Sequence, residues 1–427
     1  MQTSATGETH RGGDELTLAG VVVCLVFEHS LSHYTRLLQE IDALRGAHAE
    51  VELLTSWTEC GAPFDRSRRT VAPLDPAVAV SIVASGASWR PLRLADNVVR
   101  NATRFMLRIL LRGSARRSRS KALRRVAERA NVFWVIDYPS LPLVLRAARA
   151  AKRTVVYETV DLVPEYPYRG ERARRRAIDG ERRALREVDG FITACESYAD
   201  YYVETYGDVT LTRRAVVRDN MPSRIMPRAE PSHSPLRLLF LGSLMFDRPV
   251  AELIEAMACV GGGATLTFQG KNYLGESPSH LIARLGLGTR VTVLPPCPPD
   301  EVVERASAYD IGIVALRGDG ENERRASTSK LFTYMAAGLA VLGSDLPGIA
   351  RIVQRHSNGV LVEGMDPADW SMAMTGLLSM PDAAINSMKR RSLDAARLYA
   401  WEKQRPAFLA EFVRALERGG WERARGQ

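Results

Sequence analysis

Apolar residues gather into short continuous runs along the chain, and a longer amphipathic stretch separates each run from the next. Residues 18–27 form one such run, which has the length of a buried strand. Residues 32–47 follow with leucine or isoleucine at positions 37, 38, 41 and 44, a spacing that places them on one face of a helix. Strands that alternate with helices in this way predict parallel sheets covered by helices, which is an α/β fold.

The alternation continues in two sets, one in each half of the chain. In the first half we predict further strands at 51–55, 78–83, 131–136, 154–158, 190–194 and 215–217, with a helix at 141–151. In the second half we predict strands at 237–241, 265–268, 291–294, 311–315, 339–343 and 359–362, with helices at 249–259, at 277–285 and from 370 onward. Two such sets predict two doubly wound, Rossmann-like sheets that face a central cleft. Ligands of such sheets bind beyond the carboxyl ends of the strands.

A proline-rich stretch separates the two sets. Residues 220–236 hold four prolines and few apolar residues, which is typical of a linker. A chain of 427 residues also suits two domains better than one. We therefore predict a disordered N-terminus at 1–15, a first domain at 16–221, a linker at 222–235, a second domain at 236–398 and a C-terminal helix within 399–427.

The chain is basic, with 58 lysines and arginines against 49 aspartates and glutamates. A GC-rich coding sequence explains the excess of arginine, and no zinc-knuckle or recognition-helix motif predicts nucleic-acid binding. Residues 90–130 hold 13 basic residues beside an apolar stripe. Three interpretations are open: a helix that lies on an anionic membrane surface, a segment that binds an acidic acceptor, or a basic face exposed to solvent. We favour the last.

Five scattered cysteines without a Cys-x-x-Cys pair predict reduced thiols in a cytoplasmic protein. No apolar run reaches the roughly 18 residues that span a bilayer, and the polar first fifteen residues show no signal peptide. We expect a cytoplasmic protein, and peripheral membrane contact through 90–130 stays open as an alternative.

The motif most informative about function begins at Ser327. Residues 327–330 read Ser-Thr-Ser-Lys and precede an apolar helical face, so hydroxyls and a lysine stand at a helix N-terminus. Such a terminus binds anions readily because its backbone N–H groups are free and the helix dipole favours negative charge. An ordinary capped helix explains the same residues equally well.

Residues 328–341 resemble the donor-binding signature of GT-B glycosyltransferases of the family-4-like group. Their pattern is close to Pro-x-Lys-x-x-Glu-Tyr-Met-Ala-Ala-Gly-x-Pro-Val. The resemblance implies that Ser329 and Lys330 bind the diphosphate of a nucleotide sugar. The family glutamate, which accepts hydrogen bonds from the ribose, is Thr333 here. A hydroxyl still bonds a ribose but without charge assistance, which favours a donor with fewer ribose hydroxyls, such as a deoxythymidine diphosphate sugar.

The turn at 242–249 resembles the family pattern Gly-Arg-Leu-x-x-x-Lys-Gly, although alone it is an ordinary strand-to-helix turn. Gly242 is kept, Arg248 stands at the family lysine and Ser243 replaces the arginine. The resemblance implies that these three residues contact the diphosphate. We further predict a flexible loop at 317–325 that reaches toward the donor. Its glutamates lie out of register with a paired-glutamate motif of related enzymes, so no role is assigned to them.

Three carboxylates follow predicted strands of the first domain. Asp137, Glu158 and Asp161 resemble family strand ends that commonly also carry histidines, which are Ile136 and Val160 here. Carboxylates at such ends are candidates to orient an acceptor hydroxyl or to stabilise an oxocarbenium-like state. Helix caps or surface ion pairs are the alternative for each of them.

The C-terminal segment also resembles the family. Residues 401–403 resemble a Ser-Trp-Glu element, which implies that the last helix crosses back onto the first domain. No Asp-x-Asp, P-loop or Gly-x-Gly-x-x-Gly motif supports a metal-clamped transferase, nucleotide hydrolysis or hydride transfer.

We therefore expect a metal-independent glycosyltransferase that moves a sugar from a nucleoside diphosphate sugar, its co-substrate, to an acceptor hydroxyl or amine. Family membership implies retention at the anomeric carbon. A polysaccharide, a lipid and a small secondary metabolite all stay open as acceptors. A non-catalytic GT-B subunit that activates a partner transferase and a nucleotide-sugar epimerase are the alternative functions.

Overall fold

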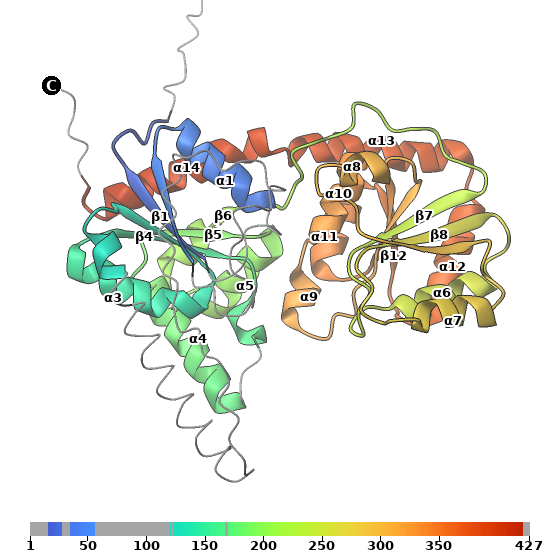
Figure 1. Cartoon of the computed structure of the whole chain (residues 1–427), viewed down its shortest axis with the longest axis horizontal. Coiled ribbons are helices and arrows are strands. Elements are labelled where there is room, and N and C mark those ends of the chain that lie inside the picture. Colours follow the sequence, from blue (N-terminus) through green and yellow to red (C-terminus); the bar gives the residue numbers. More distant parts are fainter. Residues whose placement is uncertain (1–15, 28–34, 56–119, 121–122, 167–169, 422–427) are drawn as a thin grey trace, which may run out of the picture.

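The computed structural model describes residues 16–27, 35–55, 120, 123–166 and 170–421. The predicted strand at 78–83 and most of the basic segment 90–130 lie outside these residues. The described chain folds around two parallel sheets that lie side by side, each with helices on both faces (Figure 1). The α/β architecture predicted from the alternation of strands and helices is thus confirmed.

The first sheet has the order β2-β1-β3-β4-β5-β6 and is parallel throughout. Its strands are β1 (Val22–Phe27), β2 (Glu50–Thr55), β3 (Val132–Ile136), β4 (Thr154–Thr159), β5 (Gly190–Thr193) and β6 (Val216–Val217). The two central strands β3 and β4 are buried along their whole length. Strand β3 accordingly reads as a continuous apolar run, whereas β4 reads TVVYET and carries the buried Glu158 near its end. The helices of this half are α1 (Thr35–Gly46), α3 (Leu141–Ala151), α4 (Glu171–Leu185) and α5 (Glu196–Tyr206).

The second sheet has the order β12-β11-β10-β7-β8-β9 and is also parallel. Its strands are β7 (Leu236–Leu241), β8 (Ala264–Gln269), β9 (Val291–Leu294), β10 (Ile311–Val314), β11 (Ala340–Ser344) and β12 (Gly359–Val362). The helices are α6 (Val250–Cys259), α7 (Ser277–Arg284), α8 (Val302–Ala306), α9 (Glu321–Arg325), α10 (Ser329–Ala337), α11 (Pro347–His356) and α12 (Pro367–Leu378). Gly338 ends α10 in a left-handed conformation, with φ of 76°.

Two final helices run along one side of both sheets, α13 (Asp382–Leu398) on the second and α14 (Trp401–Arg418) on the first (Figure 1). Phe408 and Phe412 of α14 both pack edge-on against Trp134 of β3, with ring centroids 5.7 Å apart in each pair. The Trp401 ring packs edge-on against Phe408, with ring centroids 5.6 Å apart. The end of the chain therefore supplies part of the first domain's core.

Helix α4 has only a weak apolar face, made of alanines with Ile178 and Leu185, and we did not predict it. Its anchor is a buried carboxylate, Glu181, which accepts hydrogen bonds from the hydroxyls of Tyr157, Tyr202 and Tyr206 at 2.7–2.8 Å. Burial outweighs these bonds and raises the pKa of Glu181 to about 7. The Glu181 carboxylate and three tyrosine hydroxyls thus anchor α4 to the core together with its few apolar side chains.

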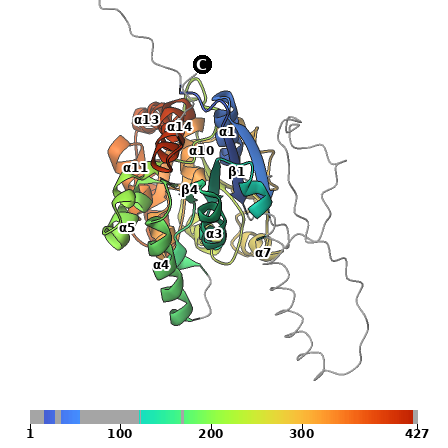
Figure 2. The ribbon, with the colours of Figure 1, turned by 90° about the vertical axis from the view of Figure 1, so that its left-hand side faces the viewer.

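Each sheet has one point at which the strand order reverses, between β1 and β3 in the first sheet and between β7 and β10 in the second. Crevices at the carboxyl ends of the strands open at such switch points. Helices α5 and α11 lie side by side between the two halves in both views (Figure 2). The two switch points therefore face one another across the region between the sheets.

Candidate functional site

A cleft of about 640 Å³ lies at these switch points and takes residues from both halves of the chain. Phe27 and Ile136 line it from the ends of β1 and β3, and Leu241 and Leu316 line it from the ends of β7 and β10. Polar residues that line it include Arg36, Glu40, Glu158, Asp161, Tyr198 and Asn220, and, from the second half, Arg248, Asn322, Glu323, Ser327, Thr328, Ser329, Lys330 and Thr333; Gly242 also lines it.

Two cations of the second half converge on this cleft. Lys330 lies in the first turn of α10, and Arg248 lies two residues before α6 begins at Val250. The Lys330 ammonium lies 4.5 Å from the centroid of the Phe240 ring and would be 3.5 Å from a Cβ atom placed on Gly242. Burial, and then the nearby charge of Arg248, lower the pKa of Lys330 to about 7. An anion bound between the two side chains would stabilise the charged form of Lys330 and so raise its pKa again.

The turn after β7 brings backbone close to this pair of cations. Gly242 has φ of 127°, a conformation in which any other residue is strained. A Cβ atom on Gly270 would lie 1.9 Å from the carbonyl oxygen of Gly242, so only glycine at 270 lets the two turns meet. Arg248 is half-buried, and its Nη1 donates to Glu323 Oε1 at 2.9 Å. Ser243, predicted to contact the diphosphate, is not among the residues that line the cleft.

Helix α10 points its N-terminus into the cleft. The hydroxyl of Tyr334 accepts a hydrogen bond from the N–H of Leu241 at 2.7 Å and donates to the carbonyl of Ile313 at 3.2 Å, which fixes the helix across the ends of β7 and β10. Thr328 is the N-cap residue, and its buried hydroxyl has no hydrogen-bond partner among the described residues. Ser329 is exposed at the same end. The predicted anion-binding terminus is therefore open to the cleft.

Thr333 lies one turn further along α10 and is buried where it lines the cleft. Its hydroxyl donates to the carbonyl of Ser329 at 2.9 Å. A hydroxyl has one donor and two acceptor lone pairs. The Thr333 oxygen is thus left to accept a hydrogen bond from a ligand, as a carboxylate would.

The structure separates the three candidate carboxylates of the first half. Asp161 is exposed, lines the cleft and accepts from Asn322 Nδ2 at 2.9 Å. Asp137 is not among the lining residues, and its Oδ1 accepts from the backbone N–H groups of Val160 at 2.9 Å and Asp161 at 3.4 Å. Asp137 therefore holds the turn that presents Asp161.

Glu158 lines the cleft from within a buried cluster. It pairs with Arg36 and accepts from the indole N–H of Trp134 at 2.9 Å. Burial and the neighbouring Glu40 raise the pKa of Glu158 to about 7, although Arg36 and Trp134 oppose the shift. Glu40 in turn contacts both Arg36 and Arg218, at 2.8 and 3.0 Å. Of this cluster, sequence reasoning found only Glu158, because no motif marks Arg36, Glu40 or Arg218, which lie inside the fold.

The prediction of a flexible loop at 317–325 is wrong for its second part, which forms the helical turn α9. Asn322 and Glu323 of α9 both line the cleft. Both oxygens of Glu323 are bound, one by Arg248 and the other by the N–H of Gly318 at 3.2 Å. A sequence of five polar residues carries no apolar signal, and the turn is ordered instead by hydrogen bonds and ion pairs.

Neither a metal cluster nor a membrane span is evident in the described part of the chain. No three histidine, cysteine, aspartate or glutamate side chains are grouped there as metal ligands. No described helix is both long and apolar enough to cross a bilayer.

Two family models match the chain. Residues 34–219 match the glycosyl transferase 4-like domain, and residues 235–380 match glycosyl transferases group 1. Among curated proteins, the D-inositol 3-phosphate glycosyltransferase of Nocardia farcinica is 28% identical over 259 residues, which cover 56% of this chain and 55% of the relative. That of Catenulispora acidiphila is 26% identical over 270 residues, covering 57% and 61%. The chain thus spans little more than half the length of these relatives.

Solved structures share the fold over nearly the whole chain. HepE of Anabaena, in complex with UDP and glucose, aligns with a TM-score of 0.63 at 13% identity and covers 92% of this chain and 99% of HepE. Sucrose-phosphate synthase of Thermosynechococcus elongatus aligns with a TM-score of 0.64 at 15% identity, covering 93% and 99%. The two family matches, one on each sheet, show that this chain belongs to the GT-B glycosyltransferases of group 1, the GT4-like family.

Proposed function

We propose that this protein transfers a sugar from a nucleoside diphosphate sugar to an acceptor, with retention at the anomeric carbon and without a metal ion. The observation that carries the proposal is the convergence of Lys330, Arg248 and the free N-terminus of α10 on one cleft. Two cations and a set of unpaired N–H groups form a site for a diphosphate. HepE, which has the same fold, is solved with UDP-glucose, so UDP-glucose is the first donor to test.

In this proposal the second half of the chain stabilises the leaving group. As the glycosidic bond to the diphosphate breaks, negative charge grows on the phosphate oxygens. Lys330 and Arg248 are already in place for that charge, and preorganised cations in a partly dry site stabilise it more than water does. Thr333 accepts a hydrogen bond from the ribose, because its own proton is committed to Ser329.

The first half supplies the acceptor side. Asp161 is the exposed carboxylate on the cleft, and we propose that it orients the acceptor hydroxyl or amine. The Glu158 carboxylate is bound by Arg36 and Trp134, so we propose that it has a structural role: it fixes the first-half side of the cleft and contributes to the charge there. Asp137 supports the Asp161 turn through backbone N–H groups. The polysaccharide, lipid and small-metabolite acceptors all stay within this proposal.

The proposal is tested by thermal-shift and calorimetric titration with UDP, GDP, ADP, dTDP and UDP-glucose. We expect at least one nucleoside diphosphate to raise the melting temperature and to bind with a dissociation constant in the micromolar range, since a bound ligand stabilises the folded state by mass action. No stabilisation by any of them would contradict a donor site. Turnover of the donor into an epimer without an acceptor would favour the epimerase alternative.

Donor affinity is expected to fall as the pH rises above 7. Lys330 has a pKa of about 7 in the free protein, and a bound diphosphate, which stays ionised throughout, raises that pKa. Binding then takes up a proton, so affinity is greatest below pH 7 and declines by up to about tenfold per pH unit above it. Calorimetry with UDP-glucose at pH 6.0 and 8.5 measures this. Lys330→Met should remove the dependence, and an equal slope in that variant would assign it to another group such as Glu158.

A further inference from the structure

Helix α9 contacts the first half of the chain through Asn322 and, at its end, through Arg325, which pairs with Glu204 at 2.7 Å. Between these two residues, Glu323 contacts the donor cation Arg248. All the hydrogen bonds of the Asn322 side chain go to the first half. Its Nδ2 donates to Asp161 at 2.9 Å, and its Oδ1 accepts from the N–H of Leu162 at 3.1 Å and from the hydroxyl of Tyr198. The Tyr198 hydroxyl also lies 3.2 Å from the Asn322 carbonyl. The Asn322 side chain is therefore hydrogen-bonded to the segment that follows β4 and to α5. We call this set of hydrogen bonds the clasp on Asn322.

Glu323, the next residue, makes its contacts within the second half. One carboxylate oxygen accepts from Arg248 at 2.9 Å, and the other accepts from the backbone of Gly318 at 3.2 Å. Helix α9 is a single turn of five residues, so these two neighbours cannot shift independently. The path Asp161–Asn322–Glu323–Arg248 is continuous, and all four residues line the cleft.

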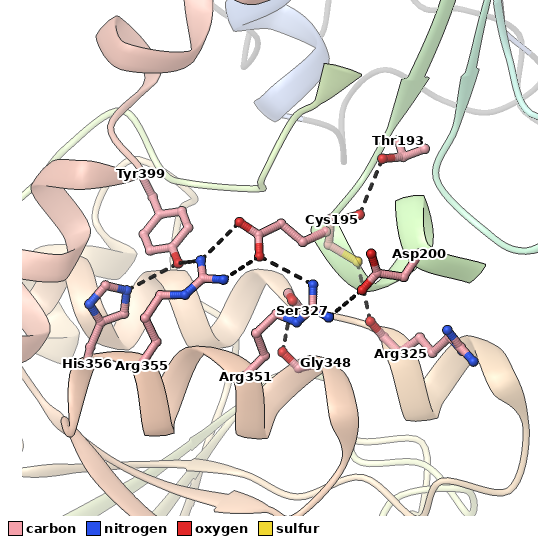
Figure 3. Close-up of polar contacts among 11 residues, drawn as sticks. Thr193, Cys195, Asp200, Arg325, Ser327, Gly348, Arg351, Arg355, His356 and Tyr399 are labelled. Atoms are coloured by element: carbon pink, nitrogen blue, oxygen red, sulfur yellow. Dashed lines mark hydrogen bonds and ion pairs between the residues drawn. The ribbon is translucent and has the colours of Figure 1, made fainter. Parts of the chain in front are cut away.

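A second set of contacts joins the same two halves without touching this path. Arg351 and Arg355 of α11 pair with Glu196 and Asp200 of α5 (Figure 3). Arg355 Nη2 lies 2.7 Å from Glu196 Oε2, and its Nη1 lies 3.0 Å from Oε1. These ion pairs hold α5 and α11 together, and none of them is made by α9. They provide the matched control for any role of Asn322.

We propose that Asn322 is a positioning residue that couples docking of the first half to the placement of Arg248 for the diphosphate. When the first half is docked, the clasp on Asn322 fixes α9, and Glu323 then holds the Arg248 guanidinium toward the cleft. When the clasp is lost, α9 and Arg248 lose that support. The positions of Asp161 on the acceptor side and Arg248 on the donor side are thereby coupled through α9. This inference rests on the proposed function, because it concerns the same donor site.

The test is a double-mutant cycle on the full chain, with calorimetric titration of the nucleoside diphosphate that the unmutated protein binds best. Asn322→Ala should weaken binding about 3- to 10-fold, which lies in the lower part of the range for coupled neighbours. In an Arg248→Gln background, Asn322→Ala should change the affinity by no more than about twofold, because Asn322 acts on the ligand through the Arg248 guanidinium, which is already absent. Arg355→Gln, which loosens the same domain contact elsewhere, should stay within about twofold of the unmutated protein.

Three outcomes would overturn the inference alone: an Asn322→Ala effect that persists in the Arg248→Gln background, an Arg355→Gln effect as large as that of Asn322→Ala, or no effect of Asn322→Ala. The first two would assign Asn322 to general domain contact. Unmutated protein that binds no nucleoside diphosphate would instead overturn the proposed function, and with it this inference. Thermal melting of each variant confirms folding, and Asn322→Ser serves as a second variant if Asn322→Ala does not fold.

Discussion

Replacing Lys330 with methionine is expected to weaken nucleoside diphosphate binding by about 10- to 100-fold while the protein stays folded. A hydrogen bond to a charged group in a partly buried site contributes about 1.5–3 kcal/mol, and no buried acid depends on this lysine for an ion pair among the described contacts. Methionine keeps the length of the side chain and its packing against Phe240. Calorimetric titration of the preferred nucleoside diphosphate measures the loss.

Lys271→Met is the matched control for this change. Lys271 is an exposed lysine of the same half, stacked over Tyr273, and it is not among the residues that line the cleft. Its removal should leave the affinity within about twofold if the effect of Lys330 is local, because exposed charges are screened by solvent and salt. Equal losses in the two variants would show that only the overall positive charge of the domain matters.

Replacing Glu40 with glutamine is expected to destabilise the first half by about 3–5 kcal/mol, the range seen when one partner of a buried ion pair is removed. Glu40 contacts the guanidinium groups of Arg36 and Arg218, and all three side chains are buried. Without its charge, only the buried carboxyls of Glu158 and Asp219 face these two buried cations. For a domain of this size the melting temperature should fall by roughly 6–20 °C, which differential scanning calorimetry measures.

Glu301→Gln removes a comparable ion pair from the surface. Glu301 pairs with Arg305 at 2.6 Å, but both side chains are exposed. Exposed pairs contribute little because water screens them, so no measurable change of the melting temperature is expected. A shift as large as that of Glu40→Gln would contradict the account of the buried cluster. Nucleoside diphosphate binding in the Glu40→Gln protein, measured below its transition, reports whether the second half is intact.

The fold could be predicted because its strands are apolar runs of the right length. Strands β3 and β10 are buried on both faces, and each left an unbroken run in the sequence. Helix α3 was predicted with the bounds that the structure has, since its apolar positions repeat at helical spacing. Helices α4 and α9 could not be found in this way, because α4 has only a weak apolar face and α9 has none, and hydrogen bonds to Glu181 and Asn322 help to hold them.

The candidate site could be predicted from sequence where backbone geometry imposes a residue type and where a family motif marks the residue, as it does for Lys330 and Arg248. Gly242 and the polar start of α10 mark a turn and a helix terminus that any diphosphate site of this kind needs. Asn322 and Arg36 carry no such mark, because their importance comes from which distant residues the fold brings to them. The catalytic roles of Asp137, Glu158 and Asp161 stay predictions, and of the three we favour Asp161 for its position on the cleft.

The central claim is that Lys330 and Arg248 bind one diphosphate together. A crystal structure of the full chain with the nucleoside diphosphate that stabilises it most tests this directly. The account predicts phosphate oxygens within about 3 Å of both the Lys330 ammonium and the Arg248 guanidinium, the distance of a charge-assisted hydrogen bond, with the α10 N-terminus facing the same group. A diphosphate bound elsewhere, or bound in this cleft by neither cation, would contradict it.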